Sequence, residues 1–234
     1  MVDTIHLYCL LWVREQGKNC AMTVVSERDR VGGDELKKLE RIRRAALKSF
    51  ATRGAAATSL RSVAADAGVS LGLVQHHFET KAGLIKAVDD YVMSIMIAVV
   101  AQPVSAPPRD SVADMGSRIG TLISEHPEVV DYYGRALVDG SPLGVTIFDT
   151  LSAFGTVRWN QRKDNGEVRP EVDLTWATLN SLVLAVGTLI LRGHIERQLP
   201  NAFGAPESLQ RWLDSTTMLL RDGLFVQSAG DTNT

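Results

Sequence analysis

Hydrophobic residues recur at the three- and four-residue spacing of an α-helix along most of the chain, and no segment shows the clear alternation of a β-strand. The first such pattern runs from about Asp34 to Arg53, and the following Gly54 is a helix stop. Its apolar face consists of Leu36, Leu39, Ile42, Ala46 and Phe50. The patterning therefore predicts an all-α protein whose first helix begins near residue 34.

Two short helices joined by a tight turn are predicted next. Thr58 or Ser59 caps the first of them, since a hydroxyl can accept a hydrogen bond from the free backbone amides of a helix start. Gly68 supplies the turn, because a left-handed backbone costs glycine little. Ser70 caps the second helix, which ends near His77. The first of the pair buries Leu60, Val63, Ala64 and Ala67.

The second short helix has one buried stripe and one outward side. Val74 and Phe78, four residues apart, form the buried stripe. The remaining positions are expected to point mostly outward, and they are Leu71, Gly72, Leu73, Gln75 and His77. Outward leucines suit a helix in a DNA groove, where apolar side chains meet thymine methyl groups. The pattern therefore indicates a helix-turn-helix, which places its second helix in the major groove.

The rest of the chain is predicted to be helical as well. A helix from about Lys81 is ended by the proline-rich segment 102–108. Further helices are predicted at Arg109–Glu125, Glu128–Asp139, Pro142 to about Lys163, Glu171 to about Gln198, and Pro206 or Glu207 to Phe225. The expected domains are a poorly ordered extension (1–33), the helix-turn-helix domain (34–80), a helical C-terminal domain (81–226) and a frayed tail (227–234).

Charge is unevenly distributed along the chain. Between Arg28 and Lys86 there are twelve basic and six acidic residues, a surplus of six positive charges. Because the formal net charge is −2, the remainder carries −8. This asymmetry favours binding of a polyanion by the basic segment 28–86, although a basic helix face can also be simply solvated.

The composition favours a cytoplasmic protein. Cys9 and Cys20 are the only cysteines, so a disulfide framework of the secreted kind is excluded. The apolar runs Ile5–Val13 and Leu182–Leu191 are too short to span a bilayer, so no membrane association is expected.

Two chemical motifs have simpler structural explanations. Gly68 to Gly72 matches the G-x-S-x-G nucleophile elbow, which would make Ser70 the nucleophile of a serine hydrolase. That chemistry needs a strand before the turn, whereas the preceding residues predict a helix. Adjacent His76 and His77 point about 100° apart on a helix, and no cysteine or carboxylate completes a metal site. We therefore expect no catalysis, no metal and no cofactor.

Residues 41–88, RIRRAALKSFATRGAAATSLRSVAADAGVSLGLVQHHFETKAGLIKAV, resemble the N-terminal domain of the TetR family of transcriptional regulators. The matching landmarks are an A-A-x-x-x-F helix, a glycine, a T-S-x-R-x-[VI]-A helix, A-G-V-S, and H-F-x-x-K. The resemblance implies a dimeric, all-helical regulator that binds a palindromic operator. It also implies that residues 81–226 form an effector-binding and dimerisation domain, and that the operator is released when a small molecule enters it. The resemblance further implies a prokaryotic protein that is associated with the nucleoid when it is bound to DNA.

The resemblance assigns DNA contacts to eight residues: Arg61, Ser70, Leu71, Gly72, Leu73, Gln75, His77 and Lys81. Arg61 would reach a groove edge or a phosphate, and His77 and Lys81 would contact phosphates. The segment SLGLVQHHF departs from the usual S-K-G-T-L-Y-x-x-F, so Leu71 and Leu73 replace polar or basic contacts. Gln75 replaces a tyrosine and can pair bidentately with adenine. A different operator is therefore expected.

The dimer interface and the effector pocket are both expected in the C-terminal helices. A four-helix bundle built from Glu171–Gln198 and Glu207–Phe225 of each subunit is the expected homodimer interface. Phe148, Trp159 and Asn180 place aromatic or lone polar groups on apolar faces, so they are candidate lining residues of a pocket for a hydrophobic effector. The alternative left open is a helical dimerisation protein that does not bind DNA.

Overall fold

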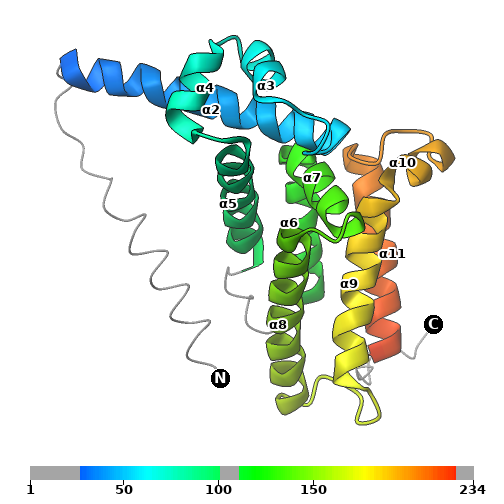
Figure 1. The fold of residues 1–234 in the computed structure, drawn as a ribbon. Helices are drawn as coiled ribbons and strands as arrows, with labels where there is room; N and C mark the ends of the chain where they lie inside the picture. The colour runs from blue at the N-terminus through cyan, green and yellow to red at the C-terminus, as the bar shows by residue number, and fades with distance from the viewer. Residues whose placement is uncertain (1–26, 101–110, 225–234) are drawn as a thin grey trace. The chain divides into compact units, whose positions relative to one another are not determined.

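The computed structural model describes residues 27–100 and 111–224, and its regular elements are all helices (Figure 1). The all-α prediction is therefore confirmed. The helices are α2 (Glu27–Arg53), α3 (Leu60–Ala67), α4 (Leu71–Phe78), α5 (Lys81–Val100), α6 (Ser111–Glu125), α7 (Pro127–Val138), α8 (Pro142–Asp164), α9 (Leu174–Ile190), α10 (Arg192–Ile195), the 3₁₀-helix η2 (Glu196–Gln198) and α11 (Pro206–Leu224).

The chain divides into two compact units, residues 1–39 and 40–234, and each is described by itself. In the first unit the described residues form the beginning of α2, where Lys38 and Asp34 make an ion pair of 2.5 Å. The helix begins at Glu27 rather than near Asp34, so residues 27–33 are helical and do not belong to the predicted extension. The rest of that extension, with both cysteines, and the tail lie outside the described residues.

One large hydrophobic core connects most helices of the second unit. It includes Phe50 of α2, Val74 of α4, Val88 of α5, Tyr133 of α7 and Leu209 of α11, all buried. The predicted apolar face of the first helix is buried at Ile42, Ala46 and Phe50. The helix-turn-helix and the C-terminal helices are thus joined by continuous packing.

Three contacts link α2, α5 and α7 within this unit. The Arg43 guanidinium of α2 lies 4.1 Å from the centre of the Tyr91 ring of α5, a cation–π geometry. The rings of Phe50 and Tyr132 lie 6.2 Å apart, which joins α2 to α7. Tyr132 also hydrogen-bonds Asp89 of α5, so α7 contacts both helices that flank the helix-turn-helix.

Helices α8 and α9 approach each other closely. A Cβ atom added at Gly155 of α8 would lie 2.8 Å from Cγ2 of Thr178 on α9, a distance that real Cβ atoms do not show. Only glycine therefore fits at this crossing. Farther along α8, Trp159 packs with Val168 and Ala177 in a second, smaller core.

The long helix predicted from Glu171 to Gln198 is broken, which corrects the sequence prediction. Asp173 caps α9 by accepting hydrogen bonds from two backbone amides, and the helix ends at Ile190. Leu191 has φ −87° and ψ 5°, outside the α-helical range, and the chain bends by 67°. Arg192 then forms an ion pair of 2.5 Å with Asp131 of α7.

Of the described helices, none alone has the length and apolarity to cross a membrane, although α9 and the segment Arg192–Gln198 meet that requirement together as the bent pair.

Candidate nucleic-acid interface

Helix α3 begins with a reciprocal cap. The Ser59 side chain accepts a hydrogen bond of 3.0 Å from the Ser62 amide, and the Ser62 hydroxyl accepts one of 3.2 Å from the Ser59 amide. This capping box satisfies two amides that the helix itself leaves without partners. The sequence prediction offered Thr58 or Ser59 as the cap, and Ser59 is the residue used.

Gly68 forms the turn between α3 and α4. Its φ of 66° and ψ of 40° are left-handed, and its amide bonds the Ala65 carbonyl at 3.1 Å. The Val69 amide bonds the Ala64 carbonyl at 3.0 Å, which closes the end of α3. Ser70 then caps α4 by accepting a hydrogen bond of 3.2 Å from the Leu73 amide.

These bonds also explain the G-x-S-x-G motif. The segment before Gly68 is α3 and not the strand that a nucleophile elbow requires. The Ser70 hydroxyl accepts from the Leu73 amide, as a helix cap does.

Helix α4 presents a limited outward surface. Val74 is fully buried, as predicted, and fixes the helix against the core. Gly72 and Gln75 are exposed, and so is His76, which the sequence reasoning did not single out as a contact. Ser70 is exposed just before the helix. The accessible side of the helix therefore centres on its first turn and on the pair Gln75–His76.

Leu71 and Leu73 are less outward than predicted. Both are half-buried and pack against the core that contains Val74. Leu71 and Phe78 lie three residues before and four after Val74, so they share its side of the helix. Only part of each leucine side chain is left to contact a groove.

The predicted phosphate contacts occupy different environments. Arg61 is exposed on α3, whereas His77 is half-buried and stacks edge-on against the His76 ring at 5.0 Å. Lys81 donates a hydrogen bond of 3.0 Å to the Ala56 carbonyl in the turn between α2 and α3. Lys81 thus ties the start of α5 to that turn, a structural role that its position in the motif did not indicate.

A polar network fixes α3 against α2. Arg53 donates hydrogen bonds to Ser49 at 2.8 Å and to Asp66 at 3.2 Å, and the buried Ser49 hydroxyl donates to Asp66 at 3.1 Å. On α2 the basic side chains of Arg41, Arg44 and Lys48 are exposed. The network holds the helix pair rigid, and the exposed cations give it a positive surface.

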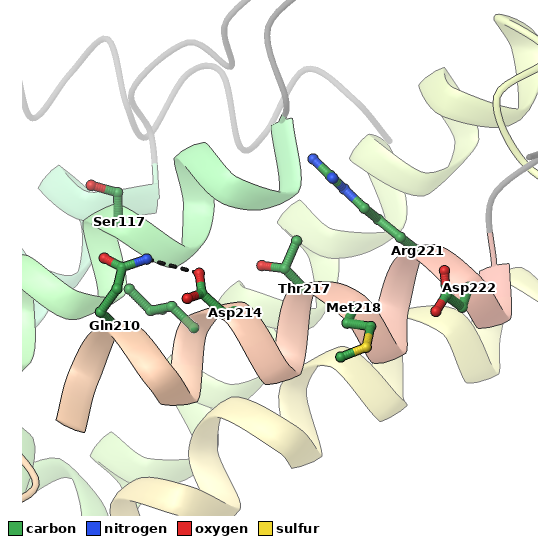
Figure 2. A pocket seen from close by; sticks show the side chains of 8 residues that line it. Ser117, Gln210, Asp214, Thr217, Met218, Arg221 and Asp222 are labelled. Atoms are coloured by element: carbon green, nitrogen blue, oxygen red, sulfur yellow. Dashed lines mark hydrogen bonds between the residues drawn. The ribbon is translucent and has the colours of Figure 1, made fainter. Parts of the chain in front are cut away.

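A pocket of about 460 Å³ lies between α6 and α11, and Figure 2 shows Ser117 of α6 facing the row of α11 side chains. Gln210 donates a hydrogen bond of 2.8 Å to Asp214 along α11. The lining is mostly polar or charged and consists of Ser117, Gln210, Leu213, Asp214, Thr217, Met218, Arg221 and Asp222. Leu213 and Met218 supply the apolar part of the lining.

The three predicted lining residues of an effector pocket lie elsewhere. Trp159 is buried in the second core, Phe148 is half-buried on α8, and Asn180 is exposed on α9. None of them lines the pocket between α6 and α11. Their role in effector binding stays a prediction.

Helices α9 and α11 expose large hydrophobic side chains. On α9, Trp176, Val183 and Ile190 follow one another at intervals of seven residues, and Trp176 and Val183 are 60% and 62% exposed. On α11, Met218 and Leu219 are 59% and 61% exposed. We call these five side chains the apolar face. Val186 and Leu209, which lie in the two segments predicted for the interface, are instead buried within the chain.

Comparison with known proteins identifies the helix-turn-helix segment. Residues 42–88 match the family described as bacterial regulatory proteins, tetR family. The transcriptional regulatory protein RaaS of Mycobacterium tuberculosis is 31% identical over 134 residues, which cover 57% of this chain and 60% of RaaS. The transcriptional repressor Rv3405c of the same organism is 37% identical over 103 residues, covering 44% of this chain and 48% of the repressor.

A solved structure extends the likeness to the C-terminal helices. A TetR family transcriptional regulator from Chloroflexus aurantiacus has a TM-score of 0.66 at 15% identity, over 82% of this chain and 95% of its own. This likeness concerns the fold. The chain spans between about half and three fifths of the length of the curated relatives that it matches. At residues 42–88 the chain is therefore similar to the bacterial regulatory proteins of the tetR family.

Proposed function

We propose that this protein is a transcriptional regulator, acting as a repressor in the cytoplasm. It binds a near-palindromic operator as a homodimer and leaves the operator when a small molecule binds its C-terminal helices. The observation that carries the proposal is the capped helix α4, which Val74 anchors in the core while Gly72 and Gln75 stay exposed. The match of residues 42–88 to the tetR family supports the same function.

Specificity and affinity are assigned to different side chains. In a two-fold dimer the two α4 helices enter successive major grooves about 34–36 Å apart. Gln75 reads a base edge, and Gly72 with the exposed parts of Leu71 and Leu73 lets the helix approach closely. Phosphate contacts, which carry no sequence information but set the salt dependence, come from Arg61, His77, Lys81 and the exposed cations of α2. Ser70 is assigned, with Leu71, Gly72 and Leu73, to the reading end of α4.

Selection of bound sequences from random duplex DNA tests this function. We expect an enriched near-palindrome whose half-sites are one helical turn apart. Gln75→Ala should weaken binding to that sequence by about 1–3 kcal/mol, since one bidentate base contact is lost, and leave binding to random DNA unchanged. Gln161→Ala, at an exposed position of α8, is the matched control. If Gln75→Ala lost the same affinity for the selected sequence and for random DNA, its role in specificity would be disproved. If the selection enriched no sequence at all, the alternative of a helical dimerisation protein that does not bind DNA would be favoured.

The apolar face supports the homodimer. Helices α9 and α11 lie next to each other (Figure 1), and both carry exposed side chains of this face. Large exposed apolar patches are costly in a monomer and are typical of association surfaces. A two-fold arrangement would cover the face of each subunit with that of the other and build the four-helix bundle that the sequence predicted.

Effector binding is proposed for the C-terminal helices, with Phe148, Trp159 and Asn180 as the predicted lining residues. A ligand releases the operator only if it binds the DNA-incompetent arrangement more tightly than the competent one. Titration of the protein–operator complex with candidate small molecules would test this step. Displacement should be lost in a variant of the ligand site that still binds the operator.

A further inference from the structure

The pocket between α6 and α11 has the size of a small-molecule site. Its volume of about 460 Å³ lies within the range of about 300–1,000 Å³ that ligand pockets occupy. Leu213 of α11, which lines the pocket, packs against Gly116 and Gly120 of α6. A Cβ atom added at these glycines would lie 3.1 Å and 3.4 Å from the Leu213 methyl groups. The two walls of the pocket are therefore held together by close packing.

Hydrogen-bond acceptors line the part of the pocket around Asp214. Gln210 donates a hydrogen bond of 2.8 Å to Oδ1 of Asp214, which orients the carboxylate and leaves the acceptor capacity of Oδ2. Ser117 and Thr217 add two hydroxyls, and a hydroxyl can accept a hydrogen bond even while it donates another. Figure 2 shows Ser117 on α6 and the other three side chains on α11. A ligand with several N–H donors would find acceptors from both helices.

The two carboxylates of the pocket differ in their electrostatic surroundings. The pocket side chains that flank Asp214 along α11 are uncharged. Asp222 follows Arg221 in the chain, and its backbone carbonyl accepts a hydrogen bond of 2.6 Å from Arg169. A cation is therefore attracted most strongly at Asp214, because positive charges near Asp222 oppose it. The formal charge of −8 outside residues 28–86 favours the approach of a cation as well.

The pocket also has an apolar part. Leu213 and Met218 line it beside the polar groups. A methionine side chain is flexible and polarisable, so it can adapt to apolar groups of different shapes. One carboxylate with neutral acceptors, next to apolar side chains, matches a molecule that joins an ammonium group to an apolar body.

We propose that the pocket between α6 and α11 binds an amphipathic organic cation. Its ammonium group donates hydrogen bonds to Asp214, Ser117 and Thr217, and its apolar body lies against Leu213 and Met218. The site deepens the proposed function, because it gives the effector a positive charge and a place on α11. Only this regulatory consequence rests on the proposed function, and the binding itself does not.

Met218 connects the pocket to the proposed subunit surface. It lines the pocket and, at 59% exposure, also belongs to the apolar face. A bound cation would therefore contact a side chain that the second subunit is proposed to cover. Ligand and partner subunit would compete for Met218 or share it, so binding of the one would change the affinity of the other.

Three fluorescent probes that differ in charge test the site on the full chain without DNA. Dansylcadaverine carries a primary ammonium on an apolar chain, its N-acetyl derivative is neutral, and N-dansyl-6-aminohexanoate is an anion. We expect the cation to bind most tightly, as measured by fluorescence anisotropy. Asp214→Asn should weaken binding of the cation about fivefold, since an exposed ion pair contributes modestly in water. Binding of the acetylated probe should change less than twofold.

Two control variants remove the same charge elsewhere. Asp222→Asn, at the other end of the pocket, should weaken binding of the cation less than twofold. Asp149→Asn, at an exposed position of α8 outside the pocket, should leave it unchanged. Ser117→Trp, at an exposed position of α6, places a large ring in the pocket and should weaken binding of both the cation and the acetylated probe at least tenfold.

Four results would overturn the site. In the first, Asp214→Asn binds the cation as the unchanged protein does. In the second, Asp222→Asn loses as much affinity as Asp214→Asn, so that attraction is diffuse and not centred on one carboxylate. In the third, the anionic probe binds as tightly as the cation. In the fourth, Ser117→Trp leaves the affinities of both probes unchanged, which would place binding outside this pocket.

Operator binding separates this proposal from the proposed function. Asp214→Asn should bind the selected operator as the unchanged protein does, but its displacement should need about five times more dansylcadaverine. If the unchanged protein selects no operator, the proposed function fails while the three-probe measurement still decides the cation site. If the cation binds through Asp214 but never displaces DNA, the site stands and its role as effector site is wrong.

Discussion

The hydroxyl of Tyr132 on α7 donates a hydrogen bond of 2.7 Å to the carboxylate of Asp89 on α5. Burial raises the pKa of both groups, so the bond lies in a partly desolvated environment. The Tyr132 ring also packs against Phe50 of α2. Since α5 follows α4 almost directly, this pair determines how the proposed DNA-contacting helix is attached to the rest of the chain.

Removal of the Tyr132 hydroxyl should destabilise the protein. Tyr132→Phe keeps the ring but leaves the buried Asp89 carboxylate without this donor, so we expect the free energy of unfolding to fall by about 1–3 kcal/mol. Urea denaturation measures the change. Asp89→Asn keeps an acceptor for the tyrosine and should cost less. If Tyr132→Phe were as stable as the unchanged protein, the hydrogen bond would not contribute to stability.

Asp89 should also make stability depend on pH. Its pKa in the folded protein is raised above the ordinary value of 3.8, mainly by burial. The folded state therefore holds this proton more tightly than the unfolded state does. The resulting stabilisation is complete below 3.8 and is lost as pH rises through the raised pKa.

Comparison of the unchanged protein with Asp89→Asn isolates this contribution, because asparagine does not titrate. The difference in unfolding free energy should move in favour of the unchanged protein as pH falls from neutrality towards 4. Thermal or urea unfolding at several pH values measures it. A difference that moved the opposite way would mean that the folded state prefers the ionised carboxylate.

Lys81 should influence both stability and DNA affinity. Lys81→Met removes the hydrogen bond to the Ala56 carbonyl, and we expect a loss of about 1 kcal/mol in unfolding free energy. If Lys81 also contacts phosphate, the slope of log affinity against log salt should fall by about 1. Lys86→Met is the matched control, because Lys86 is exposed and pairs with Asp90 at 2.7 Å. If Lys81→Met left the slope of log affinity against log salt unchanged, Lys81 would not contact phosphate, and only its hydrogen bond to the Ala56 carbonyl would remain as its role.

The apolar face of α9 should hold the dimer together. Val183→Glu places a charge in the middle of that face, and desolvation of the charge should shift the protein from dimer to monomer and weaken operator binding. Val138→Glu is a suitable control, since Val138 is 68% exposed at the end of α7. Sedimentation measures the change. Identical oligomeric states of the two variants would place the interface elsewhere.

Local signals in the sequence were sufficient for the helix-turn-helix. Ser59, Gly68 and Ser70 determine helix starts and a turn through bonds that span at most a few residues, and the structure places all three as the pattern predicted. Val74 as a buried anchor followed from helical periodicity. The partial burial of Leu71 and Leu73 did not, because an eight-residue helix next to a core shields positions beside its buried stripe as well.

Features that depend on distant residues could not be predicted. The break after Ile190 involves Arg192 and Asp131, which lie 61 positions apart in the chain. The Tyr132–Asp89 bond joins residues 43 positions apart.

The crossing of α8 and α9 at Gly155 and Thr178 has a consequence for the spacing of these two helices. Only the Thr178 side chain stands between the two backbones there, and its Cγ2 would lie 2.8 Å from a Cβ atom at position 155. Any larger residue at that position would have to displace Thr178 and, with it, the α9 backbone. The distance between α8 and the helix that carries the proposed subunit surface is thus set by the absence of one carbon atom.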